Sequence, residues 1–336
     1  MSKYFITAIG NAIIDILAFA PDDFLQENNL NKGSMTLIDE NHIKILSKLK
    51  FEKTSSGGSA ANSVVNLSGF NVNNAFIGNV GSGNYGDIFH EDLRKNGVDF
   101  YCKNKTKFGS TARSFIIISP DAQRTMCTYL GDASHIENQI DESAIINSQI
   151  LYIEGYIWSQ EPVISALKTA IKTAKENDVK FAFSLSDSFW VNNHKEDFLE
   201  LAQQADIIFA NEEEIKALSS SSEVTLDSIK NIAPKNQNLD IIITKSSKGA
   251  IIFSSKEQKF YDIQAQKVDN VIDTTGAGDA FAAGYFYGLK NNFNISRAGQ
   301  AGNLFASHVI QKIGGRLEAK DVENIKNQLD TNNNVE

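Results

Sequence analysis

The sequence predicts an α/β fold in which helices cover both faces of a mostly parallel sheet, and three observations support this prediction. From about residue 148 onward, short β-branched apolar runs alternate with amphipathic stretches, as in QILYIEGY followed by EPVISALKTAIKTAKEN. Such alternation is typical of βαβ units, whose strands are parallel. Among the 336 residues 42% are hydrophobic, enough for a sizeable core. No internal repeat of roughly 20–50 residues is visible.

The N-terminal elements follow in order. YFITAIGNAIIDILAFA predicts a strand, a Gly-Asn turn and a second strand, because its apolar residues are β-branched and its period is short. PDDFLQENNL predicts a short helix, KGSMTLID an extended segment and ENHIKILSKLK a further helix. SSGGSAANSVVNLSGF is a glycine-rich loop that leads into a helix of small residues. NNAFIGNVG then predicts a strand, and YGDIFHEDLRKNGV predicts an amphipathic helix that ends at Gly97.

A second β-rich segment interrupts the alternation. TARSFIIISP and QRTMCTYLGD flank a polar turn at Asp121 and predict a hairpin. We expect segments 14–38 and 98–131 to form a small accessory sheet, which in an enzyme would be a lid. The rest of the chain continues the alternation through VKFAFSLSD, ADIIFAN, NLDIIITK and GAIIFSS. Residues 1–330 are therefore interpreted as one domain and the polar residues 331–336 as a frayed tail.

Charge and cysteine content exclude several classes of protein. The formal net charge of −9 argues against binding of nucleic acid by bulk electrostatics, although backbone amides could still bind a small anion. No apolar run approaches the roughly 18 residues that a membrane span needs. Cys102 and Cys127 are expected to be reduced, and no Cys/His cluster suggests zinc. A cytoplasmic protein is the expectation.

The stretch GSGNYG, residues 81–86, satisfies GxGxxG after a predicted strand and before a helix. Asp99 lies at about the distance expected of a ribose-binding carboxylate in a dinucleotide site. That fingerprint normally belongs to the first βαβ unit of its domain, whereas this stretch follows eighty residues of other structure. A tight βα turn is therefore the favoured interpretation.

Two further glycine-rich stretches carry chemistry. DTTGAGDAF opens a helix with Gly276, Ala277 and Gly278, whose N–H groups would be helix-terminal donors for an anion, and with Asp279. Two glycines weaken a helix, so dipole stabilisation by the acid does not explain them. They are explained if the amides stabilise a transferring phosphoryl group while Asp279 accepts a proton from the attacking hydroxyl. In GGSAAN, residues 57–62, glycines permit close approach to a ligand and Asn62 offers a donor and an acceptor; tight helix packing is the alternative.

GGSAANSVVNLSGF and DTTGAGDAFAAGYFYGL resemble the two signatures of the ribokinase (PfkB-type) carbohydrate and nucleoside kinases, and the resemblance extends over nearly the whole chain. It implies a three-layer ribokinase-like core with a β-rich lid. It also implies ATP and Mg²⁺ as cofactors and, in many members, a monovalent cation such as K⁺. By this resemblance Asp279 is the catalytic base, and Gly276, Ala277 and Gly278 form the anion hole.

The resemblance assigns further roles by position. By this resemblance, Asn11 and Asp15 bind hydroxyls of the acceptor substrate, and Gly57, Gly58 and Asn62 bind its sugar. Arg124 is a lid arginine that closes on the phosphates. The nucleotide is bound by Thr244 and Gly249, at the ends of a TxGxxG loop, and by Asn303 in the adenine pocket. The resemblance also implies that Asn211 and Glu214 organise Mg²⁺ through water and that Asp273 and Thr275 belong to a monovalent-cation site. The loop reads TKSSKG, so Ser246 replaces its middle glycine, and SGNYG replaces the acid-bearing turn of many relatives.

The expected acceptor is a nucleoside, with the 5′-OH of adenosine favoured. Asn11 lies four residues before Asp15, and QRTMCTYLGDA and ILYIEGYIW resemble bacterial adenosine kinase-like members of the family. Tyr156 or Trp158 could stack on a base, although core packing explains either equally well. A sugar kinase acting on ribose, fructose or 2-keto-3-deoxygluconate is the alternative. More remote are a nicotinamide oxidoreductase that uses GSGNYG and a catalytically silent regulatory protein. The chain is expected to be a monomer or a lid-joined homodimer.

Overall fold

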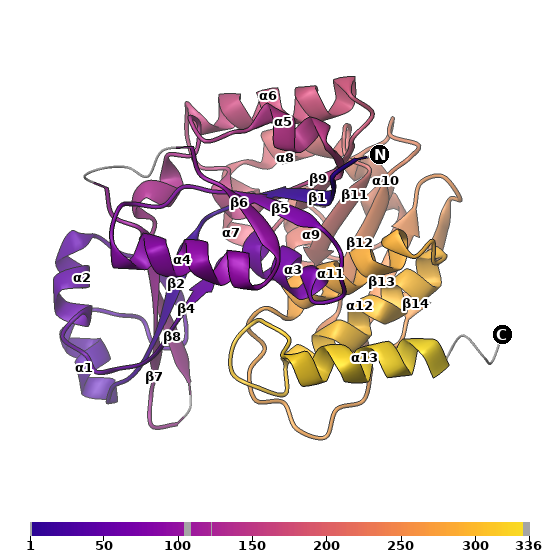
Figure 1. Ribbon diagram of the computed structural model, residues 1–336. Coiled ribbons are helices and arrows are strands. Elements are labelled where there is room, and N and C mark those ends of the chain that lie inside the picture. Colours follow the sequence, from indigo (N-terminus) through magenta and orange to yellow (C-terminus); the bar gives the residue numbers. More distant parts are fainter. Residues whose placement is uncertain (1, 104–108, 122, 332–336) are drawn as a thin grey trace.

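The protein, described as a computed structural model over residues 2–103, 109–121 and 123–331, contains two sheets of different size (Figure 1). The large sheet carries helices on both faces, which confirms the predicted α/β class. The smaller sheet stands to one side of it with α1 and α2 (Figure 1). The predicted tail lies, beyond Thr331, outside the described residues.

The large sheet has nine strands in the order β14-β13-β12-β11-β10-β9-β1-β5-β6. The seven strands from β12 to β6 are parallel, and β13 and β14 are antiparallel additions at one edge. Their bounds are β14 (Lys259–Ile263), β13 (Ala250–Ser254), β12 (Asp240–Thr244), β11 (Ile207–Asn211), β10 (Lys180–Ser184), β9 (Ser148–Glu154), β1 (Tyr4–Ile9), β5 (Asn74–Ile77) and β6 (Val98–Tyr101). Parallel neighbours of this kind need crossover connections, which the predicted helices supply.

Two hydrophobic cores lie on opposite faces of this sheet. One core is built with α3 (Ser59–Ser68), α4 (Asn84–Lys95), α11 (Ala277–Lys290), α12 (Ile295–Val309) and α13 (Ala319–Thr331). The other is built with α5 (Glu142–Ile146), α6 (Val163–Glu176), α7 (Ser188–Asn193), α8 (Lys195–Ala202), α9 (Glu212–Ser219) and α10 (Leu226–Ile232). The strands are buried on both sides, as expected of a parallel sheet between helices.

The small sheet, called the lid here, has five strands in the order β3-β8-β7-β2-β4. They are β3 (Met35–Leu37), β8 (Arg124–Tyr129), β7 (Ala112–Ile118), β2 (Ile13–Phe19) and β4 (Phe51–Gly57). The hairpin expected from TARSFIIISP and QRTMCTYLGD is present as the antiparallel pair β7 and β8. One face of the lid packs into the first core together with residues of α1 (Asp22–Glu27) and α2 (Glu40–Leu46).

The expected lid boundaries, 14–38 and 98–131, need two corrections. Residues 98–101 form β6, which pairs with β5 at the edge of the large sheet. Residues 51–57, of which 55–57 were expected to belong to a glycine-rich loop, form β4, which pairs with β2 in the lid. The first error concerns which sheet a short strand joins, a choice that side-chain alternation alone does not make, and the second concerns a glycine-rich segment that forms a strand only through its pairing with β2.

Candidate active site

Helix α11 begins at a turn that contains Gly276 and Gly278, and the turn requires glycine only at position 276. Gly276 caps the helix with φ at 73°, and a Cβ atom on it would lie 2.4 Å from the Cα atom of Gly315. A Cβ atom on Gly278, in contrast, would meet no other group of the protein within 4 Å. Packing therefore does not require glycine at 278, and the space beside its backbone remains open to a ligand. Such a helix terminus favours an anion.

One member of the expected anion hole already donates a hydrogen bond within the turn. The N–H group of Ala277 donates to the carbonyl oxygen of Thr274 at 3.2 Å. This amide already has an acceptor in the turn. The amide of Gly278, beside the open space, is the better placed donor of the expected set.

Asp279 lies in the first turn of α11 and receives two hydrogen bonds from α3. Ser59 Oγ donates to Oδ1 at 2.6 Å, and Asn62 Nδ2 donates to Oδ2 at 3.1 Å. Part of the residue is accessible, but protein surrounds the carboxyl group. Burial raises the pKa of Asp279 to about 6, against the opposing effect of the hydrogen bonds from Ser59 and Asn62. A carboxylate that titrates near neutral pH is suited to act as a general base.

The expected acceptor residues meet where β4 approaches the connection between β1 and β2. Gly58 has φ at 97°, and a Cβ atom on it would lie 2.3 Å from the carbonyl oxygen of Asn11. A Cβ atom on Gly57 would lie 2.1 Å from Oδ2 of Asp15. The glycine pair therefore allows these two segments to touch. Burial raises the pKa of Asp15 to about 7, and the positive charge of Arg316 acts against this rise.

Sequence reasoning missed Glu154, which ends β9 and joins the same two segments. Its Oε1 accepts the N–H of Asn11 at 2.9 Å, and its Oε2 accepts the N–H of Ala60 at 2.7 Å. Glu154 is 1% exposed, and burial raises its pKa to about 7. The sequence did contain a signal for Glu154. A carboxylate at the end of an apolar strand of a parallel sheet lies at the edge where such sheets usually bind ligands.

Two more missed residues reach the site from distant parts of the chain, one from a loop and one from a helix. Arg316, in the loop between α12 and α13, donates from Nε to Oδ1 of Asn62 at 2.9 Å. Its Nη1 donates to Oδ2 of Asp92, on α4, at 2.5 Å. Neither Arg316 nor Asp92 belongs to a motif of the sequence, so no local signal identified them.

The expected nucleotide residues form a second group at the carboxyl ends of β11 and β12. Asn211 and Thr244 are paired neighbours at these two ends. Gly249 has φ at 88°, and a Cβ atom on it would lie 2.0 Å from the carbonyl oxygen of Ile263. Ser246 has φ at 51°, in the left-handed region that favours glycine. The loop therefore places a serine at a position where the backbone conformation suits the glycine of the family's motif.

Asn303, on α12, ties this helix to the chain that leaves β14. Its Nδ2 donates to the carbonyl oxygens of Ile263 at 3.3 Å and Gln264 at 2.7 Å. The same stretch of chain lies against Gly249. Asn303 therefore lies beside the expected nucleotide loop.

Asn211 and Glu214 form a capping box at the start of α9. Asn211 Nδ2 donates to Oε1 of Glu214 at 2.6 Å, and the N–H of Glu214 donates to Oδ1 of Asn211 at 2.9 Å. Burial raises the pKa of Glu214 to about 7. Among residues 2–103, 109–121 and 123–331, no cluster of three His, Cys, Asp or Glu side chains could hold a metal ion. The two residues satisfy each other's polar groups, and their contact with Mg²⁺ through water stays a prediction.

Asp273, one of the two residues expected at a monovalent cation site, is paired with the lid. Asp273 accepts the N–H of Thr275 on Oδ1 at 2.9 Å and the N–H of Gly314 on Oδ2 at 2.8 Å. Arg124, expected to close on the phosphates, forms an ion pair with Oδ2 of Asp273. The carboxylate thus already has a cationic partner, and the arrangement does not fit a second cation in the same place.

Packing accounts for two of the three glycines of GSGNYG, and the third, Gly83, has φ at 113° with no group within 4 Å of an added Cβ atom. A Cβ atom on Gly81 would lie 2.7 Å from both Asp132 and Gly109, and one on Gly86 would lie 2.1 Å from the carbonyl oxygen of Gly81. Asp99 lies on β6, where its carboxylate accepts a hydrogen bond from Tyr4 at 2.5 Å. The tight βα turn is therefore the correct interpretation, and the dinucleotide alternative has no support.

The two aromatic candidates differ. Trp158 is fully buried among Phe183 and Phe198, so its role is core packing. Tyr156 is only partly buried, and its pKa is raised by burial and by the charges of Asp187, Glu214, Asp279 and Glu154. The charges of Asp279 and of Glu214 therefore both act on Tyr156.

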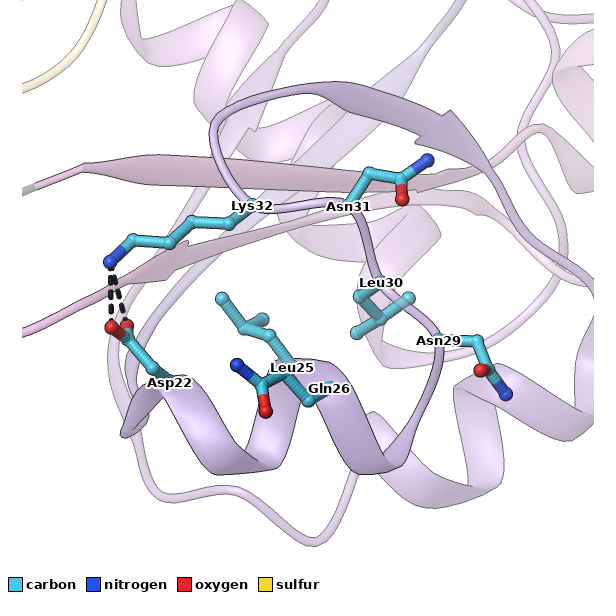
Figure 2. Close-up of a pocket in the computed structure, with 7 residues that line it drawn as sticks. All are labelled: Asp22, Leu25, Gln26, Asn29, Leu30, Asn31 and Lys32. Carbon is cyan, nitrogen blue, oxygen red and sulfur yellow. Dashed lines mark hydrogen bonds and ion pairs between the residues drawn. The ribbon is translucent and has the colours of Figure 1, made fainter.

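A surface pocket on the lid does not belong to this site. Figure 2 shows it between α1 and the following loop, with Lys32 paired to Asp22 at its margin. None of the expected site residues lines it.

Comparison with known proteins assigns this α/β core and its β-rich lid to the class of kinases that phosphorylate sugars or nucleosides. The chain belongs to the pfkB family of carbohydrate kinases, because the sequence model of that family matches residues 35–321. It is therefore a phosphotransferase, and its family implies the use of ATP. No helix within the described part of the chain is long and apolar enough to span a membrane.

Similar proteins include kinases of both acceptor classes. An adenosine kinase from Sinorhizobium meliloti is 32% identical, with a TM-score of 0.88 over 97% of this chain and 100% of that one. A probable sugar kinase from Rhizobium etli is also 32% identical, with a TM-score of 0.88 over 98% of this chain and 99% of that one. The adenosine kinase of Dictyostelium discoideum is 24% identical over 96% of this chain and 98% of its own length.

Proposed function

We propose that this kinase transfers the γ-phosphoryl group of ATP to the primary hydroxyl of a nucleoside, with the 5′-OH of adenosine as the favoured acceptor. The observation that carries the proposal is the position of Asp279, a carboxylate in the first turn of α11, beside the open space at Gly278. A base and an anion-binding helix terminus at one point are what phosphoryl transfer requires.

In the proposed mechanism Asp279 accepts the proton of the attacking hydroxyl as the new oxygen–phosphorus bond forms and the bond to ADP breaks. The hydrogen bonds from Ser59 and Asn62 hold the carboxylate in position for this transfer. The helix terminus at Gly276–Gly278 stabilises charge on the transferring group. Mg²⁺, organised through water by Asn211 and Glu214, would neutralise charge on the phosphates. Closure of the lid excludes water, which would otherwise hydrolyse ATP.

The composition of the lid supports a nucleoside over a free sugar. Paired strand residues share a face of a sheet, so the register identifies the side chains on the same face as Asp15. Apolar members of this face are Leu17, Phe19, Met35, Leu37, Ile116, Ile118 and Met126. Phe19, Met35 and Leu37 are 58%, 41% and 47% exposed. A flat nucleobase would cover such a surface, whereas a hydroxyl-rich sugar would find few polar partners on it.

The opposite face of the lid packs against the first core, which leaves Phe19, Met35 and Leu37 of the Asp15 face exposed. The similarity to the Sinorhizobium meliloti adenosine kinase supports the same acceptor. The similarity to the probable sugar kinase of Rhizobium etli keeps a sugar as the second candidate.

ADP release in a coupled assay with ATP and Mg²⁺ tests the proposal across adenosine, inosine, guanosine, ribose, fructose and 2-keto-3-deoxygluconate. A strong response to adenosine alone is expected. A response to a free sugar alone would keep the mechanism and replace the acceptor. Asp279→Asn should lower turnover by at least about 10³-fold while ATP binding persists, and retained turnover would remove Asp279 from the role of base.

A further inference from the structure

The loop that carries Arg316 is fastened to helix α3 on both sides of this residue. Asn66 Nδ2 donates to the carbonyl oxygen of Gly315 at 3.0 Å, and the N–H of Leu317 donates to Asn66 Oδ1 at 2.8 Å. Asn66 lies one helical turn after Asn62, so the same helix fixes the loop and presents Asn62 to Asp279. The position of Arg316 relative to the proposed base is therefore well defined.

The guanidinium group of Arg316 uses two of its nitrogens within the protein. Nε donates to Asn62 and Nη1 to Asp92, which also accepts a hydrogen bond from Ser56 Oγ. Nη2 is buried and has no hydrogen-bond partner among the residues that the structure describes. A buried donor without an acceptor is unfavourable, so anchoring of the loop does not by itself account for this arginine.

The bond from Arg316 determines which way the Asn62 amide points. An arginine can only donate, so Nε must face the amide oxygen of Asn62. The amide nitrogen then faces Asp279, to which it donates at 3.1 Å. Rotation of the amide by half a turn would place its oxygen against the carboxylate. Arg316 opposes that rotation because its own hydrogen bond would be lost.

Arg316 is also the positive charge that acts on the carboxylates of the acceptor group. It lowers the pKa of Asp279 and that of Asp15 against the larger effect of burial. The other groups that interact electrostatically with Asp279 are Asp15 on β2, Tyr152 and Glu154 on β9, and Tyr156 directly after it. Lys53 acts on Asp15 from β4, and Asp92 faces Arg316 from α4.

We propose that Arg316 is a positioning residue for phosphoryl transfer: it orients the Asn62 amide toward Asp279 and supplies the positive charge that keeps the base ionised. The proposal rests on the proposed role of Asp279 as the base. It assigns a catalytic contribution to a residue that lies 254 positions from Asn62 and outside both signature stretches.

Kinetics of Arg316→Gln and Arg316→Lys test the positioning role. Arg316→Gln should lower kcat by about 10- to 100-fold with ATP binding unchanged, and should move the acid limb of the kcat/KM profile upward by about 1 pH unit. Arg316→Lys should restore the acid limb but only part of kcat, because lysine keeps the charge and not the fixed geometry. The combined Asn62→Ala, Arg316→Gln variant should lose less than the product of the single losses. Equal losses at every pH, with multiplicative single effects, would overturn the proposal.

Arg297→Gln is the matched control. Arg297 is also a partly buried arginine with an unpartnered Nη2. It stacks over Phe293, beyond the end of α11 that is opposite to Asp279. This variant should leave kcat and the acid limb unchanged.

A stability measurement decides the charge effect even if no acceptor in the panel is phosphorylated. The pKa of Asp279 is higher in the folded than in the unfolded protein, so the folded state binds its proton more tightly. The contribution of this proton to the free energy of unfolding is fully present below about pH 4 and is lost as the pH rises through about 6. Asp279→Asn has no such loss. Its gain in urea midpoint over the wild type should therefore grow with pH and level off above about pH 6.

The same comparison is then made between Arg316→Gln and the Arg316→Gln, Asp279→Asn double variant, and repeated in the Arg316→Lys background. In the Arg316→Gln background the gain should continue to grow to a pH about 1 unit higher. If the gain in urea midpoint depends on pH in the same way in the wild-type and Arg316→Gln backgrounds, Arg316 has no charge effect on Asp279, whatever the acceptor proves to be. A silent acceptor panel with the expected shift would instead refute the proposed function and leave the electrostatic role of Arg316 standing.

Discussion

Arg124 of the lid forms an ion pair with Asp273, four positions before the alanine that begins α11. Arg124 begins β8 on the same lid face as Asp15, and Asp273 is 5% exposed. The pair therefore connects the lid to the turn that precedes the proposed anion hole. It also gives Asp273 a cation from the chain itself.

From this pair we expect the wild-type kinase to show no dependence on K⁺. The hydrogen bonds from Arg124, Gly314 and Thr275 lower the pKa of Asp273 despite its burial, so the carboxylate is ionised and already paired. Arg124→Gln should remove the partner and create a requirement for a monovalent cation, seen as stimulation by KCl over tetramethylammonium chloride. Equal stimulation of both proteins by K⁺ would show that Asp273 binds the ion while Arg124 is elsewhere.

The two glycines at the start of α11 should respond oppositely to alanine. Gly278→Ala meets no other group of the protein within 4 Å and replaces glycine inside a helix. The fold should be stabilised by about 0.5–1 kcal/mol, while the added methyl group obstructs the phosphoryl site and lowers kcat. Gly276→Ala combines φ at 73° with a contact of 2.4 Å to Gly315 and should destabilise the fold. Denaturant midpoints and kcat, measured on both variants, separate the effects. An active Gly278→Ala enzyme would contradict the proposed anion site.

The acid limb of the rate profile should reflect two carboxylates. Asp279 and Asp15 have pKa values raised to about 6 and about 7, mainly by burial, and both must be ionised to accept hydrogen bonds from the attacking acceptor. The logarithm of kcat/KM should therefore fall with a slope that approaches two below about pH 6. In Asp15→Asn the rate should be lower, and the slope should return to one. A slope of one in the wild type would restrict the titration to a single group.

Glu154 should matter for both stability and acceptor binding. Glu154→Ala leaves the buried N–H groups of Asn11 and Ala60 without an acceptor, which should cost about 2–4 kcal/mol of unfolding free energy. Because Asn11 is then less well fixed, KM for the acceptor should rise more than KM for ATP. Glu176→Ala, at an exposed position on α6, is the control for loss of a glutamate. An unchanged acceptor KM in Glu154→Ala would restrict Glu154 to a structural role.

The sequence by itself determined the class of fold and most of the local elements. Side-chain periodicity along the chain distinguishes a helix such as α6 from a strand such as β9 without knowledge of their neighbours. The glycine-rich stretches around Asn62 and Asp279 could also be identified without knowledge of their neighbours in space. Their unusual residues are adjacent in the chain, and the structure joins them by the hydrogen bond between Asn62 and Asp279.

The tertiary structure alone decided which sheet β4 and β6 join and which distant residues complete the site. A short strand has the same side-chain pattern in either sheet, so its place depends on pairing with remote strands. Glu154 and Arg316 reach Asn11 and Asn62 across 143 and 254 positions of sequence. The pairing of Arg124 with Asp273, two residues expected in separate roles, is decided in the same way. Contacts of this range form only when the packed helices and sheets bring their ends together.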